Sequence, residues 1–117
     1  MDDETIVSLA THPGRAGVAV VRISGTNTKD IVYKIVKEKN FKIKPREVKY
    51  CYFTDGSEII DDGLITYFQR PNSFTGEDVA ELSIHSNPFI IEELINTVEK
   101  KVLFIYNHIL GMIIILR

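Results

Sequence analysis

Two polar stretches of the sequence carry side chains and backbone groups that could bind a ligand. They are residues 11–17, THPGRAG, and residues 71–81, PNSFTGEDVAE, and each leads into a run of apolar and β-branched residues. Both are predicted to be loops that feed strands. Loops held by rigid strands are where binding groups concentrate, because the sheet does not use all of their amides and side chains.

The second stretch contains an acidic group, Glu77, Asp78 and Glu81. A fixed, partly desolvated carboxylate could accept two N–H bonds from the amidine-like edge of a heterocycle. Arg22 lies in an otherwise apolar run, where its guanidinium must reach water, pair with a carboxylate or meet an acidic group of a ligand. From the residues alone, solvated acids and a structural ion pair are the simpler interpretations, and ligand binding is the alternative.

The other candidates for chemistry have weaker patterns. The glycines of residues 14–17 could let backbone N–H groups cradle an anion, but their spacing matches no phosphate-binding motif, so a plain turn is favoured. The histidines His12, His85 and His108 are not spaced like zinc ligands, and each is more simply a structural residue. The only cysteine, Cys51, falls inside a strand pattern and is predicted to pack. We predict no metal site and no catalytic residue.

The composition fits one domain, since 117 residues with 44% hydrophobic side chains can form a single core. Fourteen basic against sixteen acidic residues leave a net charge of -2, so no basic field holds a nucleic acid, and any link to RNA is expected to be indirect. The acidic N-terminus is unlike a secretory signal, and one cysteine forms no intramolecular disulfide. A cytoplasmic setting is therefore expected.

The spacing of apolar residues predicts five strands and two helices. The strands are expected at residues 5–10, 18–23, 48–53, 58–68 and 78–85. The first helix is expected to be capped by Thr26, Asn27 or Thr28 and to run for about three turns. The second is expected to begin near Pro88 and to bury an apolar stripe.

The order of these elements is strand, strand, helix, then three strands and a helix. It predicts an α+β fold built around antiparallel pairing. Asp55 and Gly56 indicate a hairpin between the third and fourth strands, and Gly63 indicates a β-bulge.

Two blocks of this sequence resemble a known family. Residues 4–25, ETIVSLATHPGRAGVAVVRISG, resemble the opening of the bacterial MnmE/TrmE tRNA-modification GTPases, and residues 71–82, PNSFTGEDVAEL, resemble that family's PNSFTGEDVVEL stretch. The resemblance covers about residues 4–100 and identifies an N-terminal domain of this family.

The resemblance implies a fold and a ligand. In the family this domain is similar to the folate-binding part of the glycine-cleavage aminomethyltransferase, binds a 5-formyltetrahydrofolate-type one-carbon donor, and forms a homodimer. Arg22 and Glu81 match two positions of the family's folate site. A pterin edge of N–H donors suits a carboxylate, and a glutamyl tail suits a guanidinium.

The resemblance also implies a pathway. Full-length relatives work with a flavin- and NADH-dependent partner protein on C5 of the wobble uridine of tRNA. GTP hydrolysis in those relatives needs a GxxxxGKS loop, which this sequence lacks, so this chain alone is not expected to be a GTPase.

The sequence departs from the family pattern in two places. Where the family has HGGP, this chain has His85, Ser86, Asn87 and Pro88, so two glycines are replaced. After residue 100, the family's PGEFTxRAFLNGK-like segment, whose lysine belongs to the folate site, has no counterpart. We therefore expect a folate-binding and dimerisation domain at residues 1–100 and an atypical apolar tail at 101–117, which follows a truncation.

The tail is too short and too polar at its centre to span a bilayer, and no membrane contact is expected. A terminal strand, an edge covered by a partner, and out-of-frame sequence are the alternatives. The run at residues 112–116 is expected to be buried in the fold or a dimer. The second functional hypothesis is an interaction domain that has lost folate binding.

Overall fold

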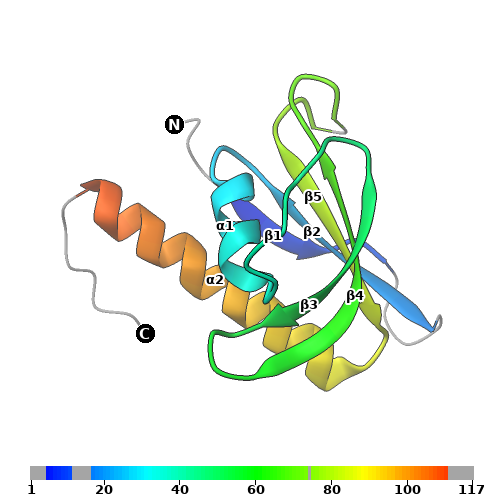
Figure 1. The fold of residues 1–117 in the computed structure, drawn as a ribbon. Coiled ribbons are helices and arrows are strands. Elements are labelled where there is room, and N and C mark those ends of the chain that lie inside the picture. The colour runs from blue at the N-terminus through cyan, green and yellow to red at the C-terminus, as the bar shows by residue number, and fades with distance from the viewer. Residues whose placement is uncertain (1–4, 12–16, 74, 111–117) are drawn as a thin grey trace.

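The computed structural model describes residues 5–11, 17–73 and 75–110. It contains one five-stranded sheet and two helices (Figure 1). The elements are β1 (Ile6–Leu9), β2 (Val18–Ser24), α1 (Thr28–Ile35), β3 (Val48–Thr54), β4 (Ile59–Phe68), β5 (Val79–His85) and α2 (Pro88–Leu110). The α+β fold and the predicted order of elements are confirmed.

The sheet has the strand order β1-β2-β5-β4-β3, and every neighbouring pair is antiparallel. The order places β2 beside β5, although about fifty residues separate them in the sequence. The two helices pack against each other and against the sheet, and Figure 1 shows the long α2 running beside it. The other face of the sheet carries no helix among the described residues.

Alternation along the strands separates the core from this open face. On β2, Val21 and Ile23 are fully buried, whereas Arg22 between them is only half-buried. The same alternation holds on β5, where Leu82 is fully buried beside the half-buried Glu81. The helices complete the core with buried residues Ile31, Val32, Ile35, Leu94 and Val98.

Helix α1 is shorter than predicted, with eight residues instead of about three turns. It ends because Val36 leaves the helix and forms an isolated antiparallel bridge with Phe53 of β3. Asn27, one of the three predicted candidates, occupies the N-cap position, but its side chain makes no capping hydrogen bond. Instead, the buried Thr28 donates from Oγ1 to Gly25 O at 2.8 Å, which ties the first turn to the end of β2.

The predicted hairpin between β3 and β4 is confirmed, but the bulge is not at Gly63. The register slips opposite the step between Phe53 and Thr54, where Ile60 is left without a partner. Gly63 has a different role, since a Cβ atom there would lie 1.9 Å from the backbone oxygen of Ser83. Glycine is needed because β4 and β5 approach closely at this point.

Helix α2 begins at Pro88 as predicted, and Asn87 caps it by accepting hydrogen bonds from Phe89 N at 2.8 Å and Ile90 N at 3.2 Å. It continues through residue 100 to Leu110, so residues 101–110 are helical and are not a terminal strand. The apolar run at 112–116 lies outside the described residues. No helix in the described part of the chain is both long and apolar enough to cross a membrane.

Candidate functional site

The two residues that the sequence singles out for ligand binding meet on the open face of the sheet. Arg22 and Glu81 are directly opposite each other in the register of β2 and β5. Arg22 donates from Nη2 at 2.7 Å and from Nε at 3.2 Å, both to Glu81 Oε2. Their side chains are 28% and 31% exposed, so the ion pair is neither fully solvated nor sealed in the core. The ion pair considered for Arg22 therefore exists, and its carboxylate is Glu81.

The pair forms one wall of an open cavity of about 640 Å³, a size within the range of small-molecule sites. The other lining residues come from the segment before β3, the end of β4 and the loop after it. The full set is Arg22, Arg46, Phe68, Asn72, Ser73 and Glu81. The cavity thus combines two guanidinium groups, one carboxylate and one aromatic ring.

The other acids of the predicted site have structural roles. Glu77 accepts a hydrogen bond from Ser24 Oγ at 3.3 Å, and Asp78 accepts one from Arg70 N at 3.0 Å. Ser73 Oγ donates to the backbone oxygen of Glu77. These bonds shape the loop between β4 and β5, and neither of these two acids lines the cavity. Of the acidic group, the structure brings only Glu81 to the cavity wall.

The glycine-containing stretch after β1 is only partly visible, because residues 12–16 lie outside the described part of the chain. At its start, Thr11 Oγ1 accepts a hydrogen bond from Val20 N at 3.1 Å.

The two residues that replace family glycines, Ser86 and Asn87, cause no backbone strain, since neither has a positive φ. Ser86 N donates instead to Gly17 O at 3.0 Å.

Among the described residues, one group could present three ligand atoms to a metal ion: Asp61, Asp62 and His85, whose atoms lie within 4.8 Å of one another. Each carboxylate already accepts hydrogen bonds, Asp61 from His85 and Asp62 from Tyr50 Oη at 2.7 Å. The group thus has a structural role that joins neighbouring strands. Sequence spacing missed it because 24 positions separate Asp61 from His85.

Cys51 is fully buried, as predicted for a packing residue. Burial, with a smaller contribution from the negative charge of Glu38, raises the pKa of the thiol to about 12. A thiol with that pKa supplies almost no thiolate near neutral pH, which favours the packing role over a nucleophilic one.

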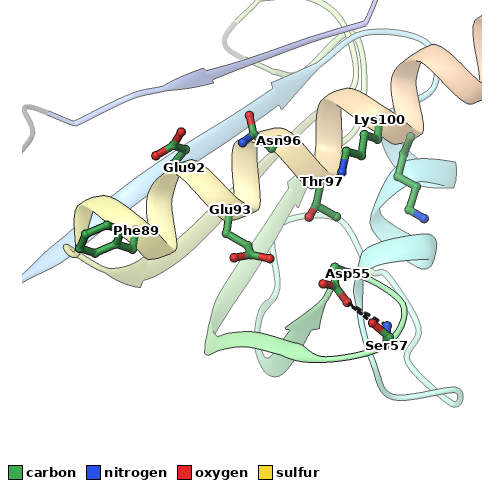
Figure 2. A pocket seen from close by; sticks show the side chains of 9 residues that line it. Asp55, Ser57, Phe89, Glu92, Glu93, Asn96, Thr97 and Lys100 are labelled. Atoms are coloured by element: carbon green, nitrogen blue, oxygen red, sulfur yellow. Dashed lines mark hydrogen bonds between the residues drawn. The ribbon is translucent and has the colours of Figure 1, made fainter. Parts of the chain in front are cut away.

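A second hollow, of about 410 Å³, lies between α2 and the turn that joins β3 to β4. Figure 2 shows Glu92, Glu93, Asn96 and Lys100 along the helix and Asp55 on the turn. Asp55 is occupied by its own turn, because its Oδ1 accepts hydrogen bonds from the backbone N of Ser57 and of Glu58, each at 2.8 Å. None of the residues predicted to bind a ligand lines this hollow.

The sequence of this chain is similar to those of known proteins. The family model described as "GTP-binding protein TrmE N-terminus" matches residues 5–107. The chain is 47% identical over 97 residues to the tRNA modification GTPase MnmE of Coxiella burnetii, covering 83% of this chain and 21% of that protein.

Further relatives give the same result. The tRNA modification GTPase MnmE of Francisella philomiragia is 44% identical over 92 residues, and that of Francisella tularensis is 41% identical over 92 residues. Each match covers 79% of this chain and 20% of the relative, so the chain spans about a fifth of the length of these proteins. The chain therefore belongs to the family of TrmE N-terminal domains, within the tRNA modification GTPases.

Proposed function

We propose that this chain binds a 5-formyltetrahydrofolate-type one-carbon donor in the cavity beside Arg22 and Glu81, as the N-terminal module of a tRNA-modification GTPase. The supporting observation is that two residues matched to the family's folate site, 59 positions apart in the sequence, form one wall of one cavity. The pathway is the modification of C5 of the wobble uridine, in the cytoplasm. GTP hydrolysis and the flavin-dependent partner belong to the full-length relatives.

The geometry sharpens the expected roles of the two residues. Because Arg22 and Glu81 touch at 2.7 Å, they would act on the same part of a folate rather than on its two opposite ends. Glu81 uses Oε2 for Arg22, and no described residue donates a hydrogen bond to its Oε1. A carboxylate in this state can accept N–H bonds from a pterin edge, while the guanidinium fixes its orientation.

The test is calorimetric titration of the protein with 5-formyltetrahydrofolate. Glu81→Gln and Arg22→Ala should each weaken binding about tenfold or more, as expected when a charge-assisted hydrogen bond is lost. Glu99→Gln changes an exposed glutamate on α2 outside this cavity and should bind like the parent. Equal affinities for all four proteins would contradict the proposed site.

We also propose that the chain forms a homodimer through the open face of the sheet. Six large apolar side chains on that face are between 39% and 59% exposed: Ile6, Val18, Val48, Tyr50, Tyr52 and Leu64. Register places them on the same face as Arg22 and Glu81. An apolar surface of this kind is typical of protein interfaces, and a self-complementary patch closes into a two-fold dimer.

Light scattering tests the dimer. Leu64→Glu should shift the protein towards the monomer, because a charge would be buried in the interface. Phe89→Glu is the control, since Phe89 is 81% exposed but lies on α2, away from this face. A dimer that persists in Leu64→Glu would contradict the proposed surface.

The second candidate function is an interaction domain that dimerises without binding folate. The apolar sheet face favours it independently of the cavity. The parent protein would then be dimeric by light scattering and show no heat with 5-formyltetrahydrofolate.

A further inference from the structure

We infer that Arg46 is a second anion-binding residue of the same cavity, and that it selects ligands that carry a carboxylate beyond the heterocycle. The inference rests on the proposed function, since it assigns the ligand's acidic end. Arg46 lies in the segment between α1 and β3, and sequence analysis did not single it out. It lines the cavity together with Arg22 and Glu81.

The backbone holds Arg46 in place at the end of β4. Its N–H donates to Tyr67 O at 2.7 Å, and the preceding Pro45 forms an isolated parallel bridge with Tyr67. Its φ is 65°, and Arg46 is the only described residue other than glycine with a positive φ. This conformation is unfavourable for an arginine and persists only where surrounding contacts enforce it. The contacts with Tyr67 therefore fix the backbone position from which the Arg46 side chain extends.

The side chain is then directed by two contacts at the cavity wall. The guanidinium carbon lies 5.5 Å from the centroid of the Phe68 ring, which is a cation–π arrangement. Nη2 donates to Asn72 O at 3.3 Å. A guanidinium has five N–H donors, and this is the one hydrogen bond from the Arg46 side chain to the described residues. N–H groups of the Arg46 guanidinium thus remain to bind an anion in the cavity.

The charges in the cavity favour the same assignment. Arg22 is balanced by Glu81 at 2.7 Å, whereas no carboxylate of the described residues makes an ion pair with Arg46. The lining therefore presents one compensated ion pair and one guanidinium without an acidic partner. Such a site suits a ligand with a neutral, donor-rich ring at Glu81 and a negative group at Arg46. In a folate, that negative group is the glutamyl carboxylate.

A comparison of two ligands tests this role. One is 5-formyltetrahydrofolate, and the other is the methylamide of 5-formyltetrahydropteroate, which keeps the same rings and the amide but carries no carboxylate. The parent should bind the glutamyl ligand about tenfold more tightly, as expected for a charge-assisted contact. In Arg46→Asn that ratio should fall to about one, with affinity for the uncharged pteroate amide unchanged. Asparagine is chosen because it tolerates a positive φ.

The control is Lys44→Asn, which removes a nearby exposed positive charge that does not line the cavity, and it should keep the parent's ratio. Circular dichroism and thermal unfolding of each variant establish that the fold is intact. A parent that binds both ligands equally, or an Arg46→Asn variant that keeps the tenfold ratio, would overturn the role of Arg46 alone. Failure of the parent to bind either ligand would overturn the proposed function and this inference together.

Discussion

His85 at the end of β5 is held by Asp61 of β4 through both its backbone and its ring. The backbone N donates to Asp61 Oδ2 at 2.9 Å, and ring Nδ1 lies 3.0 Å from the same oxygen. The hydrogen bond to Asp61, followed by the attraction of its charge, raises the pKa of His85. Burial, the largest single influence on Asp61, raises its pKa, but the hydrogen bonds from His85 and from the backbone of Asp62, with the charge of His85, together lower the pKa.

These shifts predict that the pair contributes most to stability in mildly acidic solution. The raised pKa of His85 contributes stability that is complete below its ordinary value of 6.5 and is lost as pH rises through the raised value. The lowered pKa of Asp61 contributes stability above its ordinary value of 3.8, which is lost as pH falls through the lowered value. The pair should therefore stabilise the fold most between about pH 4 and 6.5.

Urea unfolding at a series of pH values, with the parent and His85→Gln, measures this effect. The difference in free energy of unfolding between the two proteins should be largest in that window and should shrink towards pH 8. The other two histidines remain in both proteins and cancel in the comparison. A difference that is constant from pH 4 to 8 would show that the pair does not titrate as expected.

Gly63→Ala should destabilise the protein by about 3 kcal/mol or more, because a Cβ atom would lie 1.9 Å from the backbone oxygen of Ser83. Neither backbone can move without breaking the pairing of β4 with β5. Thermal or urea unfolding measures the loss. Gly17→Ala is the matched control, since nothing lies within 4 Å of a Cβ atom there. Similar losses for both variants would contradict the close approach of the strands.

The ion pair of Arg22 and Glu81 should contribute about 0.5 to 1 kcal/mol, as for a cross-strand pair that is partly exposed. Arg22→Glu places two carboxylates opposite each other and should lose more than that. Adding Glu81→Arg restores opposite charges and should recover most of the stability, which a double-mutant cycle measures. The exchanged pair should still bind folate poorly, because the carboxylate has moved to the other strand. If the exchanged protein bound folate as tightly as the parent, folate affinity would not depend on which strand carries the carboxylate.

Cys51 should report on unfolding of the whole sheet. Its burial and its raised pKa of about 12 should keep the native thiol from reacting with a disulfide reagent at pH 8. Labelling should therefore follow opening of the core, and destabilised variants should react faster. Protein unfolded in urea gives the rate for the accessible thiol. Native labelling at that same rate would place Cys51 outside the core.

The fold was largely predictable because its elements follow local patterns. Strand periodicity and the turn signals gave every strand to within about two residues, and Pro88 marked the start of α2. The errors occurred where a distant segment competes with a local preference. Helix α1 ends early because Val36 bridges to Phe53. The bulge lies at Ile60 and not at Gly63, because its position is set by the register of β3 and β4 rather than by a glycine.

The sequence by itself determined which residues are strand, helix and core, since apolar spacing reflects which face is buried, and its two motif blocks identified the family. Only the tertiary structure decided which polar residues meet. The order β2-β5-β4 places Arg22 against Glu81 and Asp61 against His85, and the Tyr67 bridge brings Arg46 to the cavity. These contacts depend on pairing between segments that are far apart in the chain. Burial of the whole core, rather than any local pattern, selects that pairing.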